Sequence, residues 1–372
     1  MNPIDELRAA RPAHLGDTPT DERTRRSELA YAMSHGTPVK RRAKPRLMWG
    51  LSLAGAAAAA VTAVAVLTAG TGAGTAPRAP SAVESSAPGE LTAQQVLLVA
   101  ATQAERQPAT SGEFWHTRTM GRHLFTAAGG YVMAVKQRDE MWVSANGVWS
   151  RSQHLGAEPA TDEDRAKWAA AGSPSEVEIP VPGKPRGMRV TIAPGKPHTG
   201  HQAGKEVFWL GRNVTLADLK GLPDDEVKLK AWLLRHYEGK STESDAPMAE
   251  DAWLFQVTAG LITDMPVSAK VRGAAFRMLA ALPSVTAVGE VTDAEGRSGT
   301  AIAFEQESRV NLADDNPGTV QDRLVIDEET GTALGRESVV VKPGGMQAGL
   351  EPGMVGSSFA VVRAEWTDSR AS

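Results

Sequence analysis

The residues most able to do chemistry are few, and they form no recognised catalytic pattern. His198 and His201 are close enough to share a metal ion, but they lie in a stretch rich in Gly, Pro and Lys with no obvious third ligand. Glu113 and Glu140 would suit acid-base work, yet no spacing rule brings the two carboxylates together. The sequence therefore predicts no catalytic residue, no metal site and no cofactor.

The remaining motifs are equally weak. The run "GTGAGT" (70–75) matches a glycine-rich phosphate loop only superficially, since it follows no strand and opens no helix. His116 and His123 lie in a strand-like run, where a structural histidine is commoner than a ligand. The chain has no cysteine, which excludes disulfides, thiolate catalysis and His/Cys zinc sites. These absences favour a binding or regulatory protein over an enzyme.

Four tryptophans are the best candidates for a ligand-lining surface: Trp115, Trp142, Trp149 and Trp209. Trp142 and Trp149 flank Asn146-Gly147, a pair that favours a two-residue type I′ hairpin turn. Strand alternation then places Met141, Val143 and Val148 on one face, and both tryptophans on the other. Both faces are partly apolar, so the tryptophans either pack inside the domain or line a concave surface for a ligand.

The elements that would position these residues read as helix, sheet, helices, sheet. Residues 91–107 carry apolar side chains at helical spacing, and Thr92 is a suitable N-cap. Strand-like runs follow to Gln153, then a short helix at 161–171 and further strands. Helices are expected next. The first is "DEVKLKAWLLRHY", with Asp224 as its cap, and the last is "PVSAKVRGAAFRMLAALPSV". Strands return after these helices. The predicted fold class is α+β, with an antiparallel, half-barrel-like sheet curled around helices.

The segment "KRRAKPRLMWGLSLAGAAAAAVTAVAVLTAG" (40–70) suggests a membrane helix. Residues 47–69 would form a helix of about 34 Å, enough to cross a hydrocarbon core of about 30 Å. A cleaved signal peptide would have a much shorter n-region, and a soluble helix apolar on every face would have to be buried all round. An uncleaved anchor is therefore the favoured interpretation of the three.

Charge predicts the orientation of this anchor. The topology-setting residues precede it: Lys40, Arg41, Arg42, Lys44 and Arg46. The positive-inside rule then places residues 1–46 in the cytoplasm and the remainder outside, as a linker (70–90) and one exported domain (91–372). Ten Lys/Arg against six Asp/Glu give the tail a charge of +4, which leaves −8 for the remainder. An acidic exterior argues against a nucleic-acid partner.

The order of these features resembles a known group of proteins. The segments "LTAQQVLLVAATQAERQPATSGEFWHTRTM", "AWLLRHYEG", "VRGAAFRMLAALPSV" and "RLVIDEETGTALGRE" look like a family of actinobacterial single-pass membrane proteins of uncharacterised function. The exported part is similar in layout to the half-barrels of periplasmic lipoprotein carriers and of envelope-stress sensors. The resemblance implies an actinobacterial cell envelope and a link to a sigma factor, although the chain lacks the cysteine of zinc anti-sigma domains.

Two hypotheses of different classes follow. In the first, the chain is an envelope sensor whose outer domain binds a molecule or protein and whose residues 1–46 dock on a cytoplasmic partner. In the second, it is an anchored carrier or chaperone, and the sheet holds a lipid or another apolar ligand. An envelope hydrolase is the third alternative, disfavoured because no nucleophile or metal constellation is recognisable.

Overall fold

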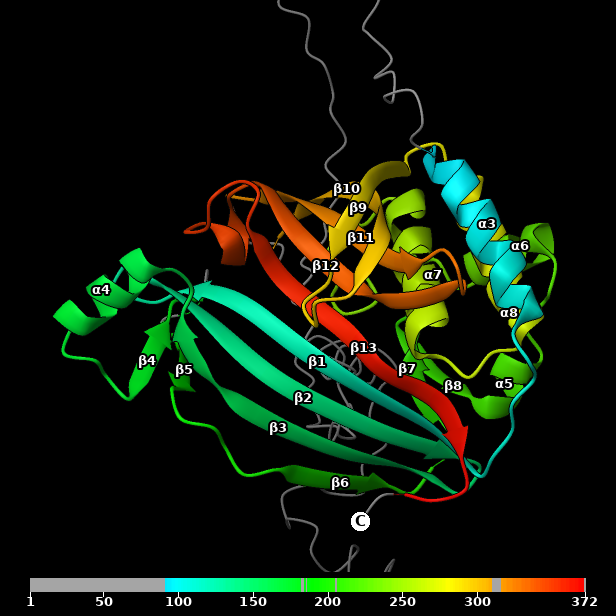
Figure 1. Cartoon of the computed structure of the whole chain (residues 1–372), viewed down its shortest axis with the longest axis horizontal. Coiled ribbons are helices and arrows are strands. Elements are labelled where there is room, and N and C mark those ends of the chain that lie inside the picture. The colour runs from blue at the N-terminus through cyan, green and yellow to red at the C-terminus, as the bar shows by residue number, and fades with distance from the viewer. Residues whose placement is uncertain (1–90, 182–183, 185, 205, 310–315, 371–372) are drawn as a thin grey trace, which may run out of the picture. The chain divides into compact units, whose positions relative to one another are not determined.

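A nine-stranded antiparallel sheet organises the described chain (Figure 1). The structure is a computed structural model and describes residues 91–372, except 182–183, 185, 205, 310–315 and 371–372. In spatial order the strands are β6 (His198–Gln202), β3 (Gly147–Pro159), β2 (Val132–Ser144), β1 (Phe114–Thr126), β13 (Val355–Thr367), β12 (Thr332–Lys342), β11 (Gly318–Asp327), β10 (Ser298–Ser308) and β9 (Thr286–Thr292). The chain thus builds half the sheet, leaves it for helices, and returns to complete it.

Six α-helices and two small hairpins surround this sheet in the described residues. The helices are α3 (Ala93–Arg106), α4 (Asp162–Ala170), α5 (Leu216–Lys220), α6 (Glu226–Leu234), α7 (Glu250–Asp264) and α8 (Ala269–Ala280). The hairpins are β4 (Glu176–Ile179) with β5 (Met188–Thr191), and β7 (Glu206–Trp209) with β8 (Arg212–Thr215), and a short 3-10 helix is η1 (Gly345–Gln347). The predicted α+β class with a large antiparallel sheet agrees with this arrangement.

Helix α7 defines the inner face of the sheet. It packs against β10, β12 and β13, and the rings of Phe255 and Phe304 stack there with centroids 5.7 Å apart. At its other end, Trp115 Nε1 of β1 donates to the carbonyl of Asp264 at 2.8 Å. Because side chains alternate along a strand, these contacts identify which residues of each strand face α7. We call this side the inner face and the opposite side the outer face.

Helices α3 and α8 form a second layer beyond α7. The capping box at Thr92 begins α3, and its buried stripe is the one that the sequence predicts. Gly273 of α8 lies so close to α3 that an added Cβ would be 2.5 Å from Glu105 Cγ. This glycine therefore permits the close approach of the two helices. Apolar side chains of α8 and of the residues beside its two ends are buried: Val267, Val271, Ala274, Met278, Leu279 and Leu282.

Two local predictions need correction. Ser144 pairs with Gly147, so Ala145 and Asn146 form the hairpin loop, and neither Asn146 nor Gly147 has the positive φ that a type I′ turn requires. The face assignment survives, since Val143 opposes Val148 and Trp142 opposes Trp149. The cap of α6 is Asp225 rather than Asp224, because the Asp225 carboxylate accepts from Lys228 N at 2.9 Å.

The predicted single-pass membrane arrangement is also corrected. Within the described part of the chain, no helix is long and apolar enough to cross a membrane. The longest, α7, has 15 residues, which corresponds to about 22 Å against a hydrocarbon core of about 30 Å. Residues 47–69, the topology-setting residues (Lys40, Arg41, Arg42, Lys44 and Arg46), the tail 1–46 and the linker 70–90 lie outside the described residues. The structure gives no support to the predicted anchor, its orientation or the exported localisation.

Candidate functional site

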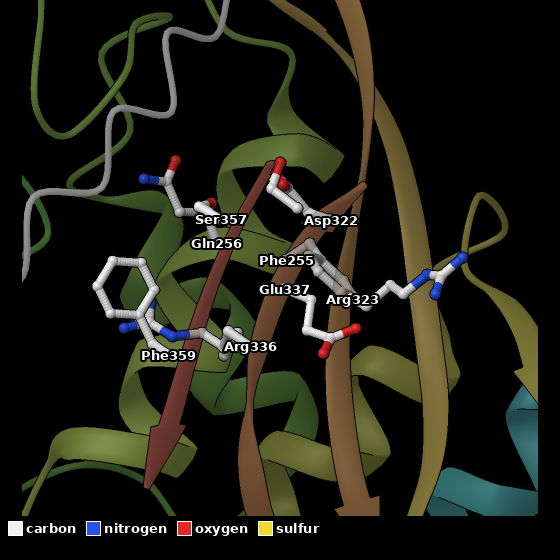
Figure 2. Close-up of a pocket in the computed structure, with 10 residues that line it drawn as sticks. Phe255, Gln256, Asp322, Arg323, Arg336, Glu337, Ser357 and Phe359 are labelled. Carbon is white, nitrogen blue, oxygen red and sulfur yellow. The ribbon is translucent and has the colours of Figure 1, made fainter. Parts of the chain in front are cut away.

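Two adjoining cavities lie between α7 and the inner face of the sheet. The first has a volume of about 70 Å³ and lies against β11, β12 and β13 (Figure 2). The second, of about 60 Å³, lies toward the β7–β8 hairpin and is lined by Trp209 and Gly260. Gln256 and Arg336 line both. We call the two cavities together the α7 groove.

An ion pair occupies the middle of the groove. Arg336 projects from β12 on the inner face, and its Nη2 donates to Asp264 Oδ2 at 3.0 Å. Asp264 ends α7 and is only 8% exposed. Burial raises the pKa of its carboxyl above the ordinary value, and Arg336 opposes that increase. The pair leaves this part of the groove close to electrical neutrality.

A second carboxyl group, that of Asp322, lines the first cavity. Asp322 of β11 faces inward opposite Ser338, and Gln306 Nε2 donates to its Oδ2. Burial raises the pKa of Asp322, while hydrogen bonds from Ser338 and Gln306 oppose the increase. The groove therefore presents the hydrogen-bonding groups of Asp322 and Gln256 beside the Arg336–Asp264 ion pair.

Gln256 contributes an amide that is only half satisfied within the described chain. Its Nε2 donates to Thr242 Oγ1 at 3.3 Å, whereas its Oε1 is buried without a hydrogen-bond partner. Turning the amide by 180° only exchanges the two ends, so one end lacks a partner in either orientation. Leaving a buried polar atom unpaired costs about 1–3 kcal/mol. A polar ligand group in the groove would remove that cost.

Apolar side chains form the rest of the wall. Phe255 and Ala259 of α7 face Phe359 of β13 across the first cavity. In Figure 2 Arg336 and Phe359 lie together, whereas the guanidinium of Arg323 points away from Gln256 and Ser357. Register explains this difference, since Arg323 pairs with Glu337 on the outer face. These two residues line the first cavity as well, but their side chains leave the sheet on its outer face.

Gly260 keeps the second cavity open. A Cβ added there would lie 3.9 Å from Arg336 Nη1 and 4.0 Å from Trp209 Nε1, so an alanine would fit without a clash. Glycine inside a helix costs about 1 kcal/mol relative to alanine. Unlike Gly273, this position has no tight packing contact that requires glycine. Packing of α7 therefore does not require the empty space beside Gly260.

The four predicted lining tryptophans do not meet in one place. Trp115 and Trp209 are on the α7 side, where Trp209 Nε1 donates to Val257 O at 3.0 Å and its ring lines the second cavity. Trp142 and Trp149 oppose each other on the outer face. Hence Trp209 is the one of the four that lines the α7 groove as described.

The outer tryptophans belong to a separate aromatic and charged cluster. His116 stacks on Trp142 with ring centroids 4.5 Å apart, and its Nε2 is 3.5 Å from Glu140 Oε2. Arg118 Nη2 donates to the same carboxylate at 3.0 Å. Burial lowers the pKa of His116, with Glu140 opposing the effect. The described partners of the Glu140 carboxylate on the outer face are thus His116 and Arg118, not Glu113.

The two histidines of the candidate metal motif do not converge in the structure. His198 and His201 both lie on β6, and three positions apart on a strand their side chains leave on opposite faces. His201 stacks on Trp149, with centroids 4.7 Å apart. Within the residues that the structure describes, no group of three His, Cys, Asp or Glu side chains could hold a metal ion.

Comparison of the chain with protein-family models, with curated proteins and with solved structures finds no match. The resemblance to the actinobacterial family therefore stays a prediction. The groove residues Gln256, Asp264, Asp322 and Arg336 were missed from the sequence. A signal existed, because Asp322 precedes the buried, inward-facing Leu324 and Ile326 at alternate positions, and a charged residue at an inward position is unusual.

Proposed function

We propose that the protein is a non-catalytic binding protein that holds an uncharged polar ligand in the α7 groove. The observation that carries the proposal is the unpaired amide end of Gln256 in a wall that also contains Arg336. A ligand with a donor and an acceptor would pair with both. The aromatic walls at Phe255 and Phe359 would cover its apolar surface.

The size of the groove favours this ligand over a lipid. A cavity of about 150 Å³ accommodates benzene, whereas the two cavities here have volumes of about 70 and 60 Å³. An acyl chain would fit only if α7 moved away from the sheet. The carrier alternative therefore requires a rearrangement that a small polar group does not. A signal from this groove to a partner of residues 1–46 stays a prediction.

Nuclear magnetic resonance on the full chain tests the proposal with acetamide and ethylene glycol as probes. The chain has nine tryptophans, and each indole N–H gives a separate reporter. We expect both probes to shift the Trp209 indole resonance and the Gln256 side-chain amide resonance. The Gly260→Leu variant, which fills the second cavity, should lose the Trp209 shift.

Two controls make the result decisive. Gly260→Ala should retain the fold, because its Cβ meets only ordinary contacts. The outer-face Trp142 indole should not respond to either probe. Shifts that are spread over all nine indoles, or that persist unchanged in Gly260→Leu, would contradict the proposed site.

A further inference from the structure

The inner face of β1–β3 is apolar at both ends and polar in the middle. At one end Phe125 and Met133 pack on the β4–β5 hairpin through Val177 and Ile179. At the other end Trp115, Val143 and Val148 are buried. Between the two ends lies a row that we call the polar band: Thr119, Gln137, Asp139, Ser150 and Ser152. All five are half-buried.

Three residues of the polar band, Gln137, Asp139 and Ser152, form a connected set of hydrogen bonds. Gln137 Nε2 donates to both oxygens of the Asp139 carboxylate at 2.9 Å, and Ser152 Oγ also donates to Asp139. In Figure 1 the helices lie toward the β9–β12 side and α4 lies at the far tip, so the middle of β1–β3 has no described helix packed on it. Its hydroxyl, amide and carboxylate groups thus form an inner wall suited to polar contacts.

Positive charge is absent from this wall among the described residues of β1–β3. The Lys and Arg side chains of the three strands all alternate to the outer face: Arg118, Arg122, Lys136, Arg138 and Arg151. Asp139 is the one formal charge of the polar band. A phosphate or carboxylate ligand would therefore meet a carboxylate and no cation, so this wall disfavours an anionic ligand.

The polar band adjoins the α7 groove. His123 of β1 pairs with Ser357 of β13, and its ring lies edge-on to Phe359 with centroids 5.0 Å apart. Ser357 and Phe359 line the first cavity. Burial lowers the pKa of His123 to about 4, so this bridging residue is neutral near pH 7. One continuous polar surface thus runs from β11 to β3, about 24 Å across five strand spacings of about 4.8 Å.

We propose that the ligand is a neutral oligosaccharide that lies along the polar band and extends one small polar substituent into the α7 groove. The inference rests on the proposed function, because it names the ligand class of the same site. Neighbouring sugar hydroxyls donate and accept together, as do the side chains of Gln137, Asp139 and Ser152. Phe359 offers an aromatic surface to the apolar face of a sugar ring.

Two other ligand classes fit less well. An acyl chain would cover the polar band without pairing its groups, which is unfavourable. An extended peptide usually pairs with the free backbone of an edge strand. The polar band lies on β1, β2 and β3, whose backbone groups are already paired on both sides where β6, β2, β1 and β13 adjoin them. Recognition here must use side chains, which suits a hydroxyl-rich chain.

Calorimetric titration of the full chain tests the ligand class. The probes are mono-, di- and tetrasaccharides of the β-1,4-glucan, α-1,4-glucan and chitin series, with the tetrapeptide Gly-Ser-Gly-Ser as the competing class. We expect at least one tetrasaccharide to bind tenfold or more tightly than its monosaccharide. Asp139→Asn, which keeps the shape of the side chain, should weaken the tetrasaccharide about tenfold and leave the monosaccharide unchanged.

Arg138→Gln is the matched control, since it is the adjacent residue but faces outward. It should retain tetrasaccharide binding. Equal affinity for mono- and tetrasaccharides, insensitivity to Asp139→Asn, or binding of the peptide alone would overturn the inference, and so would no binding of any saccharide. If acetamide still shifts the Trp209 indole in those cases, the α7 groove remains a binding site. If it does not, the proposed function fails as well.

Discussion

The two halves of the sheet are built from the same kind of strand pair but treat their inner faces differently. On β10 and β11 the inward positions carry Ile302, Phe304 and Leu324, which are buried under the helical layer. On β2 the inward positions at mid-strand carry Gln137 and Asp139, and no described helix covers them. The first half obtains stability from packing, whereas the second half presents a polar surface.

The α7 groove lies where these two halves meet. Its residues belong to both kinds of environment, with Phe255 and Ala259 on the packed side and Ser357 on the side that leads to β1. Of the carboxyl groups at this boundary, Asp264 is buried and Asp322 is half-buried, and a cavity lies beside each of them. The α7 groove is therefore the place where the helical layer ends. Variants in one half of the sheet or the other test this difference.

Loss of Arg336 should have the largest effect. Arg336→Met leaves the Asp264 carboxyl, whose side chain is 12% exposed, without its partner. Because the Arg336 side chain is itself 32% exposed, the loss of unfolding free energy should be about 2–3 kcal/mol, below the cost of breaking a fully buried pair. Urea unfolding monitored by tryptophan fluorescence measures the change. The double variant Arg336→Met with Asp264→Leu should recover much of the loss, because it leaves no unpaired charge. Equal stability of both variants would show that the ion pair contributes nothing.

The His123→Phe variant tests the boundary on the β1 side through pH. Burial lowers the His123 pKa from 6.5 to about 4, so the unfolded chain binds the proton more readily than the folded chain. Stability should fall as the pH decreases from 6.5 toward 4, by about 2 kcal/mol between pH 7 and pH 5 from this group. The phenylalanine variant should lack that part of the pH dependence in urea unfolding at several pH values.

If the unfolding free energy of His123→Phe depends on pH as steeply as that of the unchanged chain, His123 is protonated without cost in the folded chain. The variant should fold, because the ring already lies beside Phe125 and Phe359.

A comparison of two helix glycines separates the groove from the packed layer. Gly260→Ala should raise the unfolding free energy by up to about 1 kcal/mol, since it meets no clash and alanine favours the helix. Gly273→Ala should lower it relative to Gly260→Ala by about 1–3 kcal/mol, because the new Cβ overlaps Glu105 Cγ. Thermal unfolding of the two variants gives the difference, and similar stabilities would contradict the distinction.

The smallest effect is expected at the pair between α3 and α8. Glu105 accepts two hydrogen bonds from Arg277 at 2.6 and 2.8 Å, and this pair lowers the Glu105 pKa. Each side chain is about one third exposed, so the pair should contribute roughly 0.2–1 kcal/mol. A double-mutant cycle with Glu105→Gln and Arg277→Gln measures it, and a coupling energy well above that range would show that the second layer depends on charge.

Local elements could be predicted from the sequence because their signals are local. Thr92 and the buried stripe of α3 follow from capping chemistry and helical period. The turn between β11 and β12 follows in the same way from Asp327, whose Oδ1 accepts from Glu329 N and Thr330 N. The hairpin turn at Asn146 was misplaced, because Ser144 Oγ accepts from Asn146 N and moves the loop by one residue. A rule based on the Asn-Gly dipeptide alone cannot detect this competing hydrogen bond.

The groove could not be predicted because it depends on contacts between distant segments. Asp264 and Arg336 are 72 positions apart and meet only after the chain has left the sheet and returned to it. The four tryptophans are candidates for lining a ligand site by residue type alone. Alternation along the strands nevertheless places Trp142 and Trp149 on the outer face. Composition also suggested a membrane protein, an interpretation that no described helix supports. Polar residues at inward positions would have been the better guide.

A crystal structure of the full chain soaked in acetamide is the most direct test of the central claim. The account predicts an open α7 groove with ordered acetamide that bonds both the Arg336 guanidinium and the free end of the Gln256 amide. A groove closed by movement of α7 onto Phe359, or acetamide bound only elsewhere on the surface, would contradict it.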